Sequence, residues 1–150
     1  APKDTLIDGM SVLTFAISRP PKSIQQIIDD YHIDVNTDID YFLIHQANKL
    51  IVDRVVKKLK LPTDKVPYDL EEFGNLGGAS IPSLMVTRIA DAMRNNQPIK
   101  MLCSSFGLGL SWGTMLITAN NVIIPELIEI ATTADTSTRA AMNSLIFFIK

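Results

Sequence analysis

Hydrophobic and polar positions alternate along this chain in patterns that predict both strands and helices. Residues 41–45 (YFLIH) form a short, almost wholly apolar run, which predicts a buried strand. Within residues 49–60, the apolar residues Ile51, Val55 and Leu59 recur at four-residue steps. That spacing places them on one face of a helix, so the segment is predicted to be helical and amphipathic.

The segments before residue 41 are harder to assign from the pattern alone. Residues 10–17 are mostly apolar and fit either a strand or a helix. Pro20 and Pro21 are expected to break any element that reaches them. After Pro21 the spacing of isoleucines predicts a new helix to about Tyr31, followed by a polar connection.

A second strand–helix unit follows residue 62. Residues 66–70 are a weak strand candidate, because Pro67 limits the pairing of any strand that contains it. Ser80 is predicted to be the N-cap of a helix that runs to about Asn95. The chain thus alternates strands with helices, as α/β proteins do.

The last predicted strands form a pair. Residues 99–106 and 110–118 are separated by the glycine-containing link 107–109, which predicts a hairpin. The element order implies an α/β sheet with parallel crossovers and one antiparallel pair. Residues 119–150 differ in composition and form an extension of uncertain role, in which residues 125–130 could start a helix.

Composition narrows the class of protein. The chain has 150 residues, 47% of them hydrophobic and 20% charged, which fits one globular domain with a sizeable core. The net charge of −2 favours neither nucleic acid nor an anionic membrane as a partner. No apolar stretch reaches the ~20 residues that span a bilayer. The single cysteine, Cys103, cannot form an internal disulfide, which fits a reducing compartment, and the polar start of the sequence predicts no signal peptide.

Two polar residues are candidates for chemistry on a shared oxygen atom. His45 follows the predicted strand 41–45, and α/β sheets place ligands at the carboxyl ends of parallel strands. Asn75 lies in a glycine loop with Gly74. An imidazole and an amide can together stabilise an oxygen that gains negative charge. The alternatives are a histidine that only fills the core or its rim and an ordinary turn asparagine.

A third glycine-rich stretch, residues 106–113 (FGLGLSWG), is either a plain hairpin turn or a source of backbone N–H donors for an oxyanion hole. It leads into a strand rather than a helix, which disfavours a dinucleotide site. Cys103 lies in the middle of a predicted strand and is expected to be a buried structural thiol. No spacing of residues typical of metal ligands is present.

Together, the three motifs resemble β-ketoacyl-acyl-carrier-protein synthase III of the thiolase superfamily, over roughly residues 8–118. Residues 45–48 match the family signature HQAN, and residues 74–82 match its GN-x-x-x-ASIP loop. Residues 106–113 resemble its F-G-x-G-x-T-W-G ending. The resemblance implies the C-terminal half of a thiolase-like α/β fold, a mixed sheet with flanking helices. Residues 1–118 would form this catalytic half-domain, and residues 119–150 have no family counterpart.

The resemblance also implies a reaction. Members of this family condense acyl-CoA with malonyl-acyl carrier protein by a decarboxylative Claisen reaction in fatty acid biosynthesis, as cytoplasmic homodimers. His45 and Asn75 match the residues that bind the malonyl thioester carbonyl and stabilise the enolate. Phe106 matches a phenylalanine near the malonyl group, and the turn at Gly107 and Leu108 matches one that lends an N–H to the oxyanion hole. Coenzyme A enters as a thioester substrate, and no separate cofactor or metal is implied.

Several positions depart from the family pattern. The nucleophilic cysteine lies in the N-terminal half of family members, and Cys103 matches a strand residue instead. Leu108 replaces a usual glycine. Leu50 stands where relatives often carry an arginine for carrier or coenzyme A contact, and the neighbouring Lys49 is predicted to substitute for it. Pro20 and Pro21 (PP) interrupt a segment that is usually a continuous helix. This chain alone should therefore be inactive as a condensing enzyme.

Two other functions remain open at this point. The chain could be a non-catalytic subunit of thiolase fold that binds a carrier or stabilises a dimer, in which case His45→Ala would leave its function intact. It could also be a fragment whose exposed face promotes aggregation or self-pairing. The expected partners are acyl carrier protein, acyl-CoA, and either a second copy or the missing N-terminal half, with no nucleic acid and no membrane.

Overall fold

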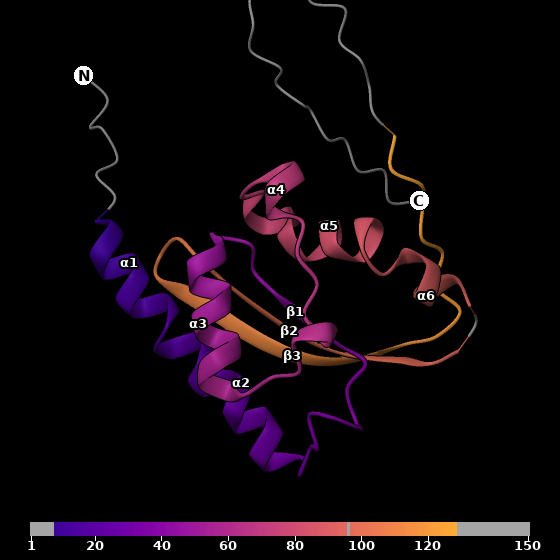
Figure 1. Cartoon of the computed structure of the whole chain (residues 1–150), viewed down its shortest axis with the longest axis horizontal. Helices are drawn as coiled ribbons and strands as arrows, with labels where there is room; N and C mark the ends of the chain where they lie inside the picture. Colours follow the sequence, from indigo (N-terminus) through magenta and orange to yellow (C-terminus); the bar gives the residue numbers. More distant parts are fainter. Residues whose placement is uncertain (1–7, 96, 129–150) are drawn as a thin grey trace, which may run out of the picture.

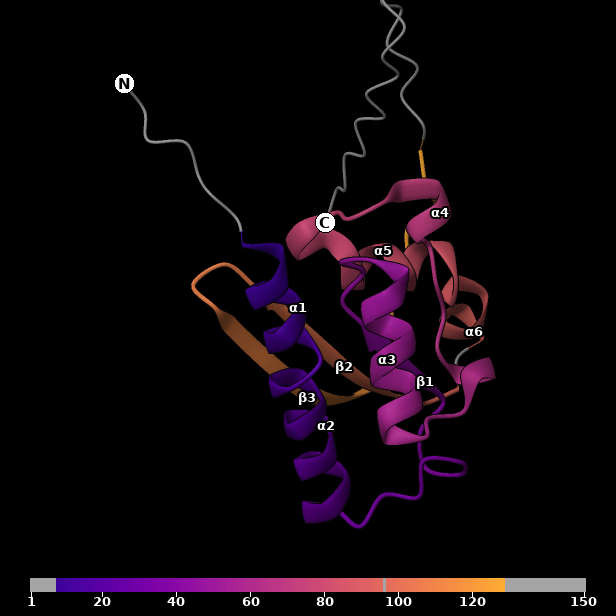
Figure 2. The same cartoon turned by 60° about the vertical axis from the view of Figure 1, so that its left-hand side comes forward.

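The computed structural model describes residues 8–95 and 97–128. Three strands form one sheet, and helices cover both of its faces (Figures 1 and 2). The first face packs against helices α1 (Gly9–Ala16), α2 (Arg19–Asp30) and α3 (Lys49–Leu59). The second face packs against the short helices α5 (Ser80–Thr87) and α6 (Ala90–Arg94). This arrangement confirms the α/β fold class with a mixed sheet and flanking helices.

The sheet consists of β1 (Tyr41–Ile44), β2 (Ile99–Gly107) and β3 (Ser111–Ala119), in the order β1-β2-β3. Strand β1 runs parallel to β2, with Leu43 opposite Cys103. Strand β3 runs antiparallel to β2, with Met115 opposite Cys103. The predicted parallel crossover and the predicted hairpin are both present.

The core has two parts, because neighbouring residues of a strand point to opposite faces of the sheet. The first part joins alternate residues of β1 and β2 to helices α1–α3; its central members are Phe42, Ile44, Leu102, Ile24 and Val52. The second part joins the intervening strand residues to α5 and α6; its central members are Leu43, Met101, Cys103, Leu84 and Ile89. The chain thus buries both faces of β1 and β2, whereas most residues of β3 are exposed.

Helix α3 has well-defined ends. The side-chain oxygen of Asn48 accepts a hydrogen bond from the backbone N–H of Ile51 at 2.9 Å, which caps the first turn. Lys60 ends the helix in the left-handed conformation, with φ 52° and ψ 40°. The buried face carries Ile51 and Val55, as the four-residue spacing predicts.

The helix predicted after Pro20 and Pro21, running to about Tyr31, is confirmed; only the position of the break differs, because the prolines belong to the first turn of that helix. Residues 10–17 are helical, since α1 covers most of them, and α2 begins at Arg19 with the prolines in its first turn. Backbone N–H groups have no helical partner in a first turn, so proline loses nothing there. Both proline rings are buried, and the break between α1 and α2 comes before them.

The weak strand prediction for residues 66–70 is also wrong. A short 3-10 turn, η1 (Thr63–Lys65), comes first, and helix α4 (Leu70–Phe73) starts inside the predicted strand. The backbone oxygen of Asp69 accepts from the N–H groups of Glu72 and Phe73, which starts α4. Val66 is buried in the core, so its apolar side chain reflects core packing rather than pairing with another strand.

The helix predicted for residues 80–95 is divided into α5 and α6. The Thr87 hydroxyl donates to the backbone oxygen of Ser83 at 2.8 Å, a contact that bends or ends helices. Ser80 is the first residue of α5, after the turn η2 (Gly77–Ala79), and its buried hydroxyl has no partner among the described residues. The N-cap prediction for Ser80 is therefore wrong.

The chain continues beyond β3 without regular structure as far as residue 128. Arg94 donates to the backbone oxygens of Ile124 and Pro125, each at 3.4 Å, and Ile124 packs against the second part of the core. The helix predicted from residue 125 is absent over 125–128, and its last two residues lie outside the described part. The boundary between residues 118 and 119 stays a prediction. No helix in the described part is long and apolar enough to cross a bilayer.

Lys60 provides a test of the helix ending. A left-handed conformation costs residues with a Cβ about 1 kcal/mol, and glycine adopts it freely. Lys60→Gly should therefore raise the free energy of unfolding by roughly 0.5–1 kcal/mol in urea titrations. The control is Lys60→Ala, which removes the same charge but keeps the Cβ. Equal stability of the two variants would contradict this reading of the helix end.

Candidate active site

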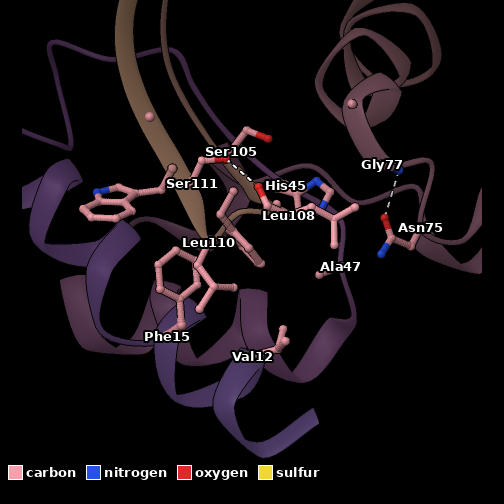
Figure 3. Close-up of a pocket in the computed structure, with 15 residues that line it drawn as sticks. Val12, Phe15, His45, Ala47, Asn75, Gly77, Ser105, Leu108, Leu110 and Ser111 are labelled. Atoms are coloured by element: carbon pink, nitrogen blue, oxygen red, sulfur yellow. Dashed lines mark hydrogen bonds between the residues drawn. The ribbon is translucent and has the colours of Figure 1, made fainter. Parts of the chain in front are cut away.

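The parallel pairing of β1 and β2 brings two of the sequence motifs to the same edge of the sheet. His45 follows the end of β1, and Phe106 and Gly107 close β2 beside it. The loop between α4 and α5 carries Asn75 to the same edge. His45, Asn75, Phe106, Gly107 and Leu108 all line one open cavity of about 720 Å³ (Figure 3). The structure therefore brings together all predicted site residues except Lys49.

His45 is held firmly and is 5% exposed. Its backbone N–H donates to the Ser104 oxygen at 2.9 Å, which extends the β1–β2 ladder by one residue. Its ring meets the Phe106 ring edge to face, with centroids 4.8 Å apart. Burial lowers the pKa of His45, so the imidazole is neutral near pH 7.

The surroundings of the ring also select its tautomer. The Nδ1 atom of His45 is buried and has no hydrogen-bond partner among the described residues. A buried N–H without an acceptor is rarer in proteins than a buried acceptor without a donor. The proton is therefore best placed on Nε2, where the neutral ring acts as a hydrogen-bond donor.

The other members of the HQAN motif have structural roles. Gln46 is fully buried, and its amide nitrogen donates to the Ile44 oxygen at 2.8 Å. Asn48 caps α3. Ala47 lines the cavity, which leaves room in front of the histidine. Of the three polar side chains in the motif, only that of His45 contributes to the cavity lining.

Asn75 is oriented by its own loop. Its side-chain oxygen accepts from the Gly77 backbone N–H at 2.9 Å, and Figure 3 shows this bond with the amide nitrogen turned away from it. The nitrogen is thus the end that remains to donate. Gly74 and Gly77 have φ of 65° and 57°, which residues with a Cβ rarely adopt.

The third motif forms the hairpin tip. Phe106 is buried, whereas Leu108 is 85% exposed at the tip. The Ser111 hydroxyl donates to the Leu108 oxygen at 2.9 Å and holds the turn, which also requires Gly109 at φ 115°. Gly107 and Leu108 both line the cavity, and the part of their backbone in an oxyanion hole stays a prediction.

Sequence reasoning missed the aromatic wall of the cavity. Phe15 of α1 contacts Phe106 and Trp112 edge to face, with centroids 6.2 and 5.5 Å apart. The guanidinium of Arg19 lies 5.8 Å from the Trp112 ring centroid. The position of Phe15 in a segment that fits either a strand or a helix gave no signal for this contact.

Lys49, predicted to bind a carrier, is the first residue of α3 and does not line the cavity. Its Nζ atom lies 4.7 Å from the Tyr68 ring centroid, a cation–π contact. The Tyr68 hydroxyl donates to Asp53 at 2.8 Å; burial first, and then this carboxylate, raise the pKa of Tyr68. Lys49 is exposed and lies two residues from Ala47, so it stands outside the cavity near one of its walls.

Cys103 is the buried thiol that the sequence predicts. It is 4% exposed and belongs to the second part of the core, on the face of β2 opposite to Phe106. Burial raises its pKa to about 11, so it carries almost no reactive thiolate at neutral pH. Among residues 8–95 and 97–128, no group of three or more His, Cys, Asp or Glu could hold a metal ion.

Known proteins share both the sequence and the fold. Residues 34–119 match the family model described as 3-Oxoacyl-[acyl-carrier-protein (ACP)] synthase III C terminal. Proteins named beta-ketoacyl-[acyl-carrier-protein] synthase III are 39% identical over 113 residues in Streptococcus gordonii and 41% identical over 115 residues in Streptococcus pneumoniae. Each alignment covers 75% of this chain and 35% of the relative.

Solved structures agree with these sequence matches. The 3-oxoacyl-(acyl-carrier protein) synthase of Burkholderia xenovorans superposes with a TM-score of 0.77 at 29% identity, over 84% of this chain and 36% of that one. The synthase III of Thermus thermophilus superposes with a TM-score of 0.68 at 31% identity, over 78% of this chain and 36% of that one. The fold is thus that of a thiolase-like α/β half.

The chain belongs to the 3-oxoacyl-[acyl-carrier-protein] synthase III family and represents its C-terminal part. It spans about a third of the length of the curated relatives that it matches. The resemblance inferred from the three motifs is confirmed, and the individual roles of the site residues stay predictions.

The burial of Cys103 predicts slow reaction with thiol reagents. With iodoacetamide at pH 8, the native chain should be alkylated at least about tenfold more slowly than the chain in urea, because both access and thiolate are scarce. Mass spectrometry over time measures both rates. Equal rates in the two states would contradict the buried position.

The neutral state of His45 predicts a pH dependence of stability. Its pKa is below 6.5 in the folded chain, so the unfolded chain binds this proton more readily. The part of the unfolding free energy that comes from keeping His45 neutral is fully present above pH 6.5. It should be lost as the pH falls below that value. Urea unfolding from pH 7.5 to 5 measures the slope. His45→Gln should flatten it, whereas the exposed His32→Gln should not; equal slopes in both variants would contradict the account.

Proposed function

We propose that this chain supplies the enolate-stabilising half of the condensing site of a 3-oxoacyl-acyl-carrier-protein synthase III. The complete enzyme would join acyl-CoA to malonyl-acyl carrier protein by decarboxylative Claisen condensation in fatty acid biosynthesis. The observation that carries the proposal is the shared cavity lined by His45 and Asn75, in a chain that belongs to this family.

In the proposed reaction, Nε2 of His45 and Nδ2 of Asn75 each donate a hydrogen bond to the thioester carbonyl oxygen of the malonyl group. The bond to the carboxylate carbon breaks, carbon dioxide leaves, and the electron pair moves into an enolate whose oxygen faces both donors. The enolate carbon then attacks an acyl thioester, and the thiolate of that thioester leaves. Donors fixed before the charge develops stabilise it without reorganising.

Two features of the cavity support this chemistry. The neutral state of His45 suits a donor to an oxygen that becomes anionic, because the ring keeps its Nε2 proton near pH 7. The wall formed by Phe106 and Phe15 is apolar. Such a wall withdraws water from a malonyl carboxylate and favours the loss of its charge as carbon dioxide.

Groups other than these two donors would perform the remaining parts of the reaction. The acyl-accepting cysteine belongs to a segment outside this chain, because Cys103 is buried on the other face of the sheet. The backbone N–H at Gly107 or Leu108 would add a donor, and Lys49 would contact the carrier. Coenzyme A enters as a thioester, no separate cofactor is required, and a cytoplasmic homodimer is the expected form.

A second candidate is a non-catalytic subunit that binds a partner. Large apolar side chains of the cavity lining are exposed, among them Leu108, Leu110 and Trp112. Such a cluster is typical of a contact surface. This function would need neither hydrogen-bond donor. Unchanged partner binding in His45→Ala, with no reaction rate lost, would favour it.

Decarboxylation isolates the proposed role, because it needs the two donors but no nucleophile. The folded chain should convert malonyl-CoA to acetyl-CoA and carbon dioxide faster than the buffer alone, with solvent supplying the proton to the enolate. His45→Ala and Asn75→Ala should each lower this rate about 10²-fold, the usual effect of losing one oxyanion donor. Chromatography of the coenzyme A thioesters measures the rate.

His32→Ala and Cys103→Ala are the controls for this experiment, since neither side chain lines the cavity. Both variants should keep the full rate, and none of the proteins should form a condensation product. A folded chain with no decarboxylation above background would contradict the proposal. So would condensation by this chain alone that Cys103→Ala abolishes.

A further inference from the structure

We propose that Asp69 is a positioning residue for Asn75: its buried carboxylate ties the start of α4 to α5 and so fixes the loop that presents the amide to the cavity. The effect on reaction rate rests on the proposed function of Asn75, whereas the tie itself can be tested without it.

Asp69, just before α4, is an acidic residue in a buried position. It is 1% exposed, and within the described part of the chain no lysine or arginine forms an ion pair with it. One oxygen of its side chain accepts a hydrogen bond from the Ser83 hydroxyl, and the other is buried with no partner among the described residues. The Thr87 hydroxyl lies 3.4 Å from the carboxylate but gives its one proton to the Ser83 backbone oxygen at 2.8 Å. A carboxylate is costly to bury without a cation, so its bond to α5 indicates a specific role.

The backbone of Asp69 completes the tie on the other side. Its carbonyl oxygen accepts from the N–H groups of Glu72 at 3.1 Å and Phe73 at 3.0 Å, which starts α4. One residue therefore begins the helix before the loop and holds the helix after it. Residues 74–79 are the connection between these two helices, and Asn75 lies within it.

The loop combines the short turn η2 with a high content of glycine. Three of its six residues are glycines, at positions 74, 77 and 78. The only side-chain hydrogen bond described within it joins Asn75 to Gly77. Glycine restricts the backbone less than other residues do, so the contacts at the two ends of the loop matter for where the amide points.

A second contact between the same segments is weaker. Arg88 donates to the Tyr68 backbone oxygen and forms an ion pair with Glu72 at 2.8 Å. Both charged side chains are partly exposed, so solvent screens their attraction. The buried contacts of Asp69 are thus the main link across the base of the loop. Displacing a catalytic group by about 1 Å can lower a rate 10²-fold, so this link matters for the chemistry.

The first test reads the loop directly. In Asp69→Ala, solvent exchange of the Gly77 amide proton, measured by NMR, should become roughly tenfold faster, the factor expected for losing one hydrogen bond. Exchange at Leu102 in β2 should not change. Asp69→Asn keeps an oxygen that can accept from Ser83, so it should retain slow exchange at Gly77. If Asp69→Ala does not fold, Ser83→Ala removes the same bond and gives the same expectation.

The second test separates positioning from a general loss of structure. Asp69→Ala should lower malonyl-CoA decarboxylation about tenfold in the wild-type background, with Asp69→Asn restoring most of the rate. In the Asn75→Ala background, Asp69→Ala should have no further effect, because the residue it positions is gone.

Two results would overturn the proposal. One is an equal loss of rate in the wild-type and Asn75→Ala backgrounds; the other is exchange at Gly77 that rises no more than exchange at Leu102. A wild-type chain without decarboxylation would contradict the proposed function instead, and the Gly77 measurement would still decide whether Asp69 holds the loop.

Discussion

The parallel pairing of β1 with β2 is the constraint on which the site depends. The register sets Ile44 opposite Ser104, and the next backbone bond, from His45 to Ser104, carries the ladder one residue past β1. This places the imidazole beside the end of β2, where Phe106 supports it. A shift of one residue would turn the histidine to the other face of the sheet. The chemistry of the cavity therefore follows from strand register more than from any single side-chain contact.

Much of the fold could be predicted from the sequence because its signals were local. Three local patterns each predict the element in which they lie: the apolar run at β1, the four-residue spacing in α3 and the glycine link of the hairpin. The differences came where a residue has two uses: Pro20 and Pro21 lie inside the first turn of α2 rather than in the break before it, and Val66 is buried without being paired. The break between α5 and α6 depends on Thr87 bonding back to Ser83, which the pattern of apolar residues does not reveal.

The candidate site could be predicted only in part, for a similar reason. His45, Asn75 and Phe106 stand in motifs that mark them, and all three line the cavity. Phe15 and Asp69 stand in no motif, and their importance arises from contacts with Phe106 and Ser83 that are distant in sequence. Asp69 in particular reads as an ordinary surface charge until its burial is known. Residues that position others are thus the ones that sequence reasoning finds last.

The central claim is that His45 and Asn75 share one oxygen atom of a thioester. A crystal structure of this chain with a malonyl thioester analogue that cannot lose carbon dioxide tests this most directly. We expect one carbonyl oxygen within about 2.7–3.1 Å of both His45 Nε2 and Asn75 Nδ2. A thioester bound with its carbonyl turned away from either nitrogen, or the two nitrogens bonded to different groups of the ligand, would contradict it.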